Sequence, residues 1–157
     1  MTDLSMVSVE SVDAVFSSHN IEHLYPYEVP IALKEFLRVL KPDGFVVITC
    51  PDLRSICQLV ADDKLDDVAY QSPSGPITPL DVLYGHGPSL ERGDHYMAHR
   101  SGFTQRTITQ SLRDAGFSGV ATMSRGRPPH FDLWALATKA TMSESDIRAR
   151  AAAHFPI

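Results

Sequence analysis

Apolar residues recur along the chain with two different periods, and each period predicts a different element. Residues 12–17 form a short apolar run between polar residues, as in a buried parallel strand. Residues 31–40 place apolar side chains on one helix face and charged ones on the other. The tetrapeptide 41–44 predicts a tight turn that ends this helix. The run 45–50, which is rich in β-branched and aromatic residues, predicts a second buried strand. Strand, helix and strand at this spacing predict a right-handed crossover and a parallel pair.

The remainder of the chain divides into an irregular segment and a second ordered block. Asp52 is the predicted N-cap of a helix over residues 53–61. Residues 62–94 are rich in Pro, Gly, Ser and Asp and predict a long excursion with one short helix near residues 80–84. Excursions of this length are usually lids or interaction elements. Four elements follow: a helix between Thr104 and Gly116, strands at 118–124 and 132–139, and a terminal helix at 143–153.

The composition excludes several kinds of protein. A formal net charge of −5 argues against a nucleic-acid surface, which needs clustered Lys and Arg. No apolar run reaches the roughly 20 residues of a membrane helix, and the N-terminus lacks the basic region and apolar core of a signal peptide. We therefore expect a cytoplasmic protein that binds neither nucleic acid nor membrane. Cys50 and Cys57 fit no redox or zinc spacing, which predicts two buried, reduced thiols.

Three separated segments carry a resemblance to a known enzyme family. They read Arg38-Val-Leu-Lys-Pro-Asp-Gly44, Leu112-Arg-Asp-Ala-Gly-Phe117 and Asp132-Leu-Trp-Ala-Leu-Ala-Thr-Lys139. They resemble the C-terminal half of a Rossmann-like, class I S-adenosylmethionine-dependent methyltransferase of the methyltransferase type 11 kind, which commonly has Gly at the position of Asp43. The resemblance implies an α/β fold with helices on both faces of a partial sheet. Its strands would correspond to strands four, five, seven and six of the family, in that spatial order, with strand seven, the last along the chain, antiparallel.

The resemblance also implies a division of the chain and a cofactor. Residues 1–140 would form a truncated methyltransferase-like domain with an irregular insertion at 62–101, and residues 141–157 a C-terminal helix and tail. S-adenosylmethionine in this family lies across the carboxyl ends of the strands. The Gly-rich loop that holds its methionine part has no counterpart before Asp13. We therefore expect the chain to be inactive alone. If its cofactor site is completed at all, we expect oligomerisation or a partner chain to supply the missing half.

The resemblance points to one cofactor contact, at the end of the first strand. In this family the segment after strand four closes on the methionyl group, which here corresponds to Ser17, Ser18 and His19. Methyl transfer depends mainly on positioning, and a base is needed only where the acceptor must lose a proton. His19 and His99 are both candidates for that base, and the sequence does not choose between them.

The irregular segment carries the residues expected on the acceptor side, because that part of these enzymes determines substrate specificity. Tyr84, His86, Tyr96 and His99 are the candidates, and the family favours a small-molecule or lipid-like acceptor over DNA. Ordinary loop packing explains the same residues. No pair of these histidines has ligand spacing on a regular element, so the sequence predicts no metal site.

Two alternative functions remain open from the sequence. The first is a non-catalytic interaction or scaffold module that keeps the fold without the cofactor. The second is a zinc hydrolase, because His19-Asn-Ile-Glu-His23 matches the H-x-x-E-H signature. That chemistry needs both histidines on one helix face, with Glu22 as general base and a third ligand such as Glu91. Pro26 leaves hardly more than one helical turn, which favours a structural role for His23 as a hydrogen-bond partner of loop backbone.

A missing sheet half has a structural consequence for the first strand. Residues 12–17 would form an apolar edge without their usual neighbour, and such edges tend to be paired or covered. We therefore expect a homo-oligomer, such as a dimer, formed through this strand, or a separate chain that supplies the missing half.

Overall fold

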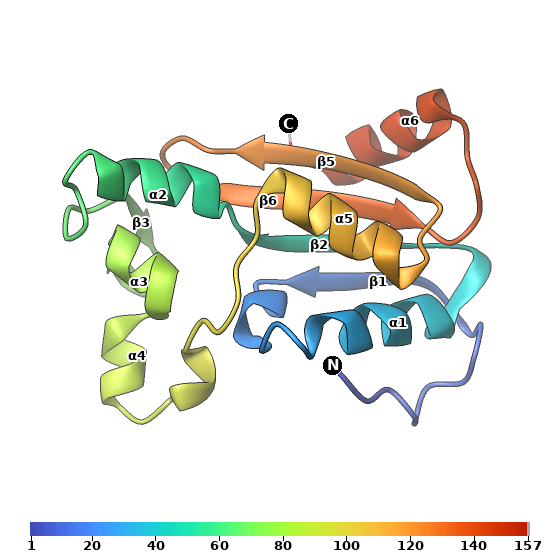
Figure 1. Ribbon diagram of the computed structural model, residues 1–157, viewed down its shortest axis with the longest axis horizontal. Coiled ribbons are helices and arrows are strands. Elements are labelled where there is room, and N and C mark those ends of the chain that lie inside the picture. Colours follow the sequence, from blue (N-terminus) through green and yellow to red (C-terminus); the bar gives the residue numbers. More distant parts are fainter. Residues whose placement is uncertain (157) are drawn as a thin grey trace.

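The computed structural model describes residues 1–156, and its centre is a mixed sheet with the strand order β1-β2-β6-β5 (Figure 1). The strands are β1 (Val12–Ser18), β2 (Leu40–Pro51), β5 (Gly119–Arg125) and β6 (Asp132–Thr138). β1 and β2 are parallel, and β6 runs antiparallel to both of its neighbours. In space, β1, β2, β6 and β5 thus follow the order predicted for strands four, five, seven and six of the family, and the predicted fold class is confirmed.

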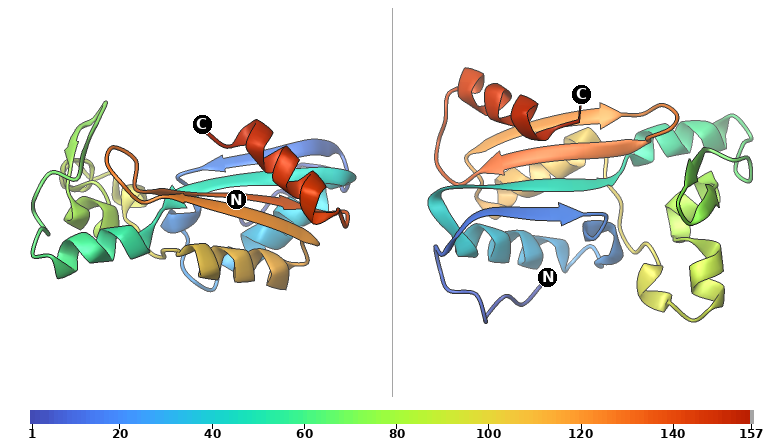
Figure 2. Two further views of the ribbon diagram at one scale, coloured as in Figure 1. Left: turned by 90° about the horizontal axis from the view of Figure 1, so that it is seen from above. Right: turned by 180° about the vertical axis from the view of Figure 1, so that it is seen from behind.

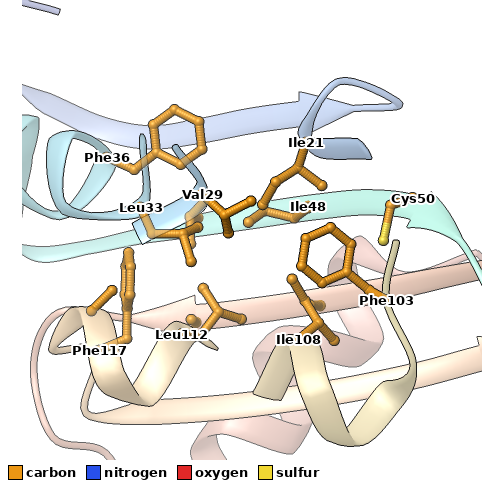
Figure 3. Packing of buried hydrophobic residues seen from close by; sticks show 14 of the residues in the cluster. Ile21, Val29, Leu33, Phe36, Ile48, Cys50, Phe103, Ile108, Leu112 and Phe117 are labelled. Carbon is orange, nitrogen blue, oxygen red and sulfur yellow. The ribbon is translucent and has the colours of Figure 1, made fainter. Parts of the chain in front are cut away.

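Helices cover both faces of the sheet (Figure 2). The long helices are α1 (Val29–Val39), α5 (Gln105–Ala115) and α6 (Glu144–His154). α1 and α5 pack on one face, where Leu33 and Leu112 are fully buried and point toward each other (Figure 3). α6 packs on the opposite face through Ile147 and Ala151, against Val47 of β2 and Leu136 of β6. The helices predicted at 31–40, after Thr104 and at 143–153 are therefore confirmed.

The ends of α5 show how the sequence sets its boundaries. Thr104 and Thr107 form a reciprocal capping box, in which each side chain accepts a hydrogen bond from the other residue's backbone N–H. At the other end Gly116 adopts a φ of 108°, a left-handed conformation that a side chain would disfavour. The predicted N-cap and C-terminal glycine are both confirmed.

The prediction of a separate turn at residues 41–44 was wrong, because β2 already begins at Leu40 and includes these residues. Val12 of β1 pairs with Leu40, and the next paired residue, Ala14, faces Phe45. The four residues between therefore bulge out of the pairing while they stay beside β1. Lys41 Nζ lies 2.8 Å from Asp13 Oδ1, and a Cβ at Gly44 would lie 3.1 Å from the Asp13 carbonyl oxygen. A side chain at this position would therefore be crowded by the β1 backbone, which favours the glycine.

The segment from residue 53 to residue 101 lies beyond the end of the sheet at which β1 and β2 finish (Figure 1). Its elements are α2 (Leu53–Ala61), β3 (Tyr70–Ser72), β4 (Gly75–Ile77), α3 (Pro79–Tyr84), α4 (Gly87–Glu91) and the 3-10 turn η2 (His95–Met97). The predicted helix near residues 80–84 is confirmed. The β3–β4 hairpin and α4 were not predicted, because three-residue strands carry too little periodicity to detect. Ile56, Ile77 and Val82 of this segment form a separate apolar cluster with Phe131, which precedes β6.

The two cysteines have different environments. Cys50 is buried at the end of β2, where burial raises the pKa of its thiol. Cys57 is exposed on α2, so the prediction that it is buried was wrong. Both thiols are free. Among the described residues, no helix combines the length and the apolarity that a membrane crossing requires.

Leu112 provides a test of the packing between α5 and α1. We expect Leu112→Ala to lower the free energy of unfolding by about 2–5 kcal/mol, because it removes a fully buried side chain and leaves a cavity. Arg106→Ala, at an exposed position of the same helix, is the control and should change it by less than about 0.5 kcal/mol. Denaturant unfolding followed by circular dichroism measures both, and equal effects would contradict the described packing.

Candidate functional site

Three strands bring their ends to one edge of the sheet. β1 ends at Ser18 and β2 at Pro51, and the antiparallel β6 begins at Asp132, which pairs with Pro51. The 3-10 turn η1 (Ile21–His23) follows β1 at the same edge. Loops that leave this edge therefore place side chains from distant parts of the sequence close together, as at the ligand-binding edge of parallel sheets.

The predicted cofactor residues differ in how far they are available to a ligand. Ser17 is buried at 4% exposure, and the Ser18 hydroxyl lies 2.9 Å from the Thr49 hydroxyl, with which it shares a hydrogen bond. His19 has a φ of 48°, unusual for a residue other than glycine, and its side chain is 50% exposed. Of these three residues, His19 is the one that lines a cavity. Their role in cofactor binding stays a prediction.

A cavity of about 150 Å³ lies between η1, the β3–β4 hairpin and α3. It is lined by residues that are far apart in the sequence: His19, Glu22, His23, Tyr70, Asp81, His86 and His99. His86 and His99, both predicted for the acceptor side, therefore share one cavity with His19. Tyr84 and Tyr96 are 65% and 67% exposed and do not line it. The structure thus brings together half of the predicted acceptor residues.

Glu22 is the most unusual residue of this cavity. Its side chain is 2% exposed, and within the described chain neither carboxylate oxygen has a hydrogen-bond partner. His19 Nδ1 lies 3.3 Å from Glu22 Oε1, close enough for an ion pair but without the orientation of a hydrogen bond. The contact with Glu22 raises the pKa of His19, against the opposing effect of burial. The sequence assigned Glu22 only to the zinc-hydrolase alternative, since nothing in its pattern indicated burial.

His23 and His99 stand edge to face, with ring centroids 4.9 Å apart. His23 Nδ1 lies 3.2 Å from the Ala98 carbonyl oxygen, and His99 Nδ1 lies 2.7 Å from the Val82 carbonyl oxygen. The hydrogen bond that the sequence predicted between His23 and loop backbone is therefore present. Burial lowers the pKa of His99, which favours its neutral ring.

A second cavity, of about 860 Å³, lies between α2, the start of α5 and the end of β5. Its buried carboxylate is Asp52, which accepts hydrogen bonds from the Arg54 N–H (3.1 Å) and from the hydroxyls of Ser55 (2.8 Å) and Ser124 (2.5 Å). The predicted N-cap role of Asp52 is confirmed. Because three donors satisfy the carboxylate, it holds α2 in place at this edge.

Asp132 is a third buried carboxylate at the same edge. Arg125 donates to both of its oxygens (2.8 and 2.5 Å), and the indole N–H of Trp134 donates to one of them (3.1 Å). Burial opposes ionisation of Asp132, but the hydrogen bonds from Arg125 and Trp134 outweigh it and lower its pKa. The sequence pattern gave no sign of this pair, because its two residues come from separate strands.

Comparison with known proteins agrees with this architecture. A family described as "Methyltransferase domain" matches residues 1–48. An S-adenosylmethionine-dependent methyltransferase from Methanosarcina mazei superposes with a TM-score of 0.55 at 18% identity, over 90% of this chain and 65% of that one. The chain has part of a Rossmann-like methyltransferase fold. A search of curated protein sequences found no match.

Two further methyltransferase structures are similar. A Haloferax volcanii putative methyltransferase, solved in complex with the Trm112 methyltransferase activator, gives a TM-score of 0.52 at 16% identity, over 91% of this chain and 60% of that one. The Burkholderia thailandensis 1,6-didemethyltoxoflavin-N1-methyltransferase was solved with S-adenosylhomocysteine. It superposes with a TM-score of 0.53 at 17% identity, over 88% of this chain and 48% of that one. The chain thus spans less than two thirds of each methyltransferase.

The ion pair of Asp132 should make stability of this methyltransferase fold depend on pH. A carboxylate whose pKa is lowered by folding stabilises the protein above its ordinary pKa of about 4, and the contribution is lost as the pH falls through the lower, folded value. We expect Asp132→Asn to lower the free energy of unfolding by about 1–3 kcal/mol at pH 7, and the difference from the unmodified chain to shrink in acid.

Denaturant titrations between pH 7 and pH 3 measure that difference. Asp66→Asn is the matched control, since it removes a carboxylate from an exposed position and should change the free energy of unfolding at pH 7 by less than about 0.5 kcal/mol. A difference for Asp132→Asn that grows in acid would contradict the assigned sign.

Proposed function

We propose that this chain supplies the acceptor side and part of the cofactor side of an S-adenosylmethionine-dependent methyltransferase, and that it acts once a partner covers β1. The observation that carries the proposal is the sheet order β1-β2-β6-β5, with a cavity at the carboxyl ends of β1 and β2. That edge is where a Rossmann-like fold binds its ligand. A small-molecule acceptor is the class that the family resemblance implies, and the cavity of about 150 Å³ would hold only part of it.

S-adenosylmethionine is the proposed cofactor. The structural neighbour from Burkholderia thailandensis contains S-adenosylhomocysteine, the product of methyl transfer. In this chain His19 is the cavity-lining residue among the predicted contacts Ser17, Ser18 and His19. His19 and His99 remain the candidates for a base, and both face the same cavity.

Dependence on a partner is supported by the surface around β1. β1 pairs only with β2 among the described strands, and Phe16 in its centre is 65% exposed. Among residues 1–156, seven of the eleven exposed large apolar side chains belong to residues 1–31, the part of the chain that contains β1. The Haloferax volcanii neighbour was solved with an activator protein, so partner dependence has a precedent in this fold. A second copy of the chain or a separate chain fits the surface equally.

Cofactor binding should follow assembly. We expect micromolar binding of S-adenosylhomocysteine in fractions where the chain is oligomeric or joined to its partner, and none at millimolar ligand in folded monomer, because the monomer offers few contacts. Light scattering followed by calorimetric titration of each fraction measures this. Tight binding by the monomer would contradict the need for completion. A folded assembly that binds no cofactor would contradict the enzyme and favour the interaction module.

Phe16 tests the assembly surface directly. Phe16→Asp should weaken association through β1, because it places a charge in an apolar contact, and should leave folding intact since the side chain is already exposed. Val68→Asp is the matched control, since Val68 is 55% exposed outside residues 1–31. Sedimentation velocity over a concentration series compares the two variants. An oligomer unaffected by Phe16→Asp would place the interface elsewhere.

A further inference from the structure

We propose that Glu22, His23 and His99 form a binding site for one divalent transition-metal ion. Each residue offers one ligand atom, and the three atoms all lie within 4.8 Å of one another. The site combines two elements, because His99 follows η2 and lies 76 residues after His23 in the chain. It does not rest on the proposed methyltransferase function, but with the metal bound His99 would be a ligand, which leaves His19 as the candidate base.

The Glu22 carboxylate is the first argument. An isolated buried carboxylate is costly, and buried charges in proteins are paired or bind metal ions. Glu22 is 1% exposed, and its two oxygens lack hydrogen-bond partners within residues 1–156. Its ion-pair contact is with His19, 3.3 Å away, whose side chain is half exposed. Its backbone is fixed as well, since the N–H groups of Arg100 and Ser101 both donate to the Glu22 carbonyl (2.8 and 3.0 Å). A cation is the kind of ligand that satisfies a carboxylate held in this way.

The orientation of the two imidazoles is the second argument. A backbone carbonyl only accepts hydrogen bonds, so the contacts with Ala98 and Val82 place the ring proton of His23 and of His99 on Nδ1. Nε2 of each ring then keeps its lone pair. Histidines that bind metals usually donate their other N–H to a carbonyl or carboxylate, which fixes the ring. A metal ion bound at the two Nε2 atoms would therefore find these second-shell hydrogen bonds already formed.

The donor set indicates which metals fit. Two imidazole nitrogens and one carboxylate suit Zn²⁺, Mn²⁺, Fe²⁺ or Co²⁺, whereas Mg²⁺ and Ca²⁺ prefer oxygen ligands. Three protein ligands leave coordination positions for water or for an oxygen atom of a molecule in the cavity.

The arrangement differs from the zinc-hydrolase motif considered in the sequence. η1 spans only three residues, and His19 precedes it in a left-handed conformation, so the two histidines do not share a helix face. Glu22 is itself a ligand here, so it is not the general base of that motif. Glu91, the third ligand considered in the sequence, ends α4 and does not line the cavity.

Metal titration of the chelator-treated chain tests the site. ZnCl₂, MnCl₂ and MgCl₂ are titrated separately by calorimetry, and CoCl₂ by absorption spectroscopy, which reports the coordination geometry. We expect one Zn²⁺ per chain and Mg²⁺ binding weaker by roughly 100-fold or more. Glu22→Gln and His99→Ala should each weaken Zn²⁺ binding by roughly 100-fold or more, because they remove a ligand. His95→Gln, at an exposed position of the same segment, is the control and should bind as the unmodified chain does.

Thermal unfolding separates loss of the site from loss of the fold. Glu22→Gln keeps the shape of the side chain, and the His19 that it leaves without an ion-pair contact is half exposed, so without metal the variant should unfold at a temperature close to that of the unmodified chain. Added Zn²⁺ should raise the unfolding temperature of the unmodified chain and of His95→Gln, but not of Glu22→Gln. Zn²⁺ binding of equal strength in Glu22→Gln and the unmodified chain, or no binding at millimolar Zn²⁺, would overturn the proposal.

Discussion

The parallel pairing of β1 with β2 is the constraint on which the rest of the structure depends. Parallel strands need a crossover, and α1 provides it with one face made of Ala32, Leu33 and Phe36 that packs into the core. The pairing also brings two strands to an end at the same edge, so that Ser18 and Thr49 lie side by side. Every loop of chemical interest leaves from that edge.

Three buried carboxylates gather at this edge, and they are satisfied to different degrees. Asp52 accepts three hydrogen bonds and holds the start of α2, and Asp132 is held by Arg125 and Trp134. Both are explained by the structure that they stabilise. Glu22 has no hydrogen bond and only an ion-pair contact with the half-exposed His19, and a buried carboxylate without hydrogen bonds weakens a fold. A buried carboxylate that lowers stability and holds no structural element in place, as Glu22 does, is expected at a functional site.

The sequence predicted the sheet and its covering helices well, because the long elements of the chain carry strong local signals. The helix that begins after Thr104 has a cap, an apolar face and a terminal glycine, and each of them specifies the same boundaries. The small cavity was only partly predictable. His86 and His99 were candidates because the family resemblance places the acceptor side in their segment. Their contact with Glu22 in one cavity depends on how residues 62–101 fold back onto η1, and the short elements of that segment show no clear hydrophobic period. Burial of Glu22 follows from contacts across the chain, such as those of Arg100 and Ser101, which no local pattern encodes.

The two cavities of this edge are therefore not equivalent. The larger one is lined by Asp52, whose carboxylate is already satisfied, and its volume of about 860 Å³ reflects the open space between α2 and α5. The smaller one gathers the histidines and the unsatisfied Glu22 at the ends of β1 and β2. Reactive chemistry needs groups that still have free donors, acceptors or lone pairs. Size would favour the first cavity, but the chemistry of the side chains favours the second as the place where a ligand of this chain is bound and oriented.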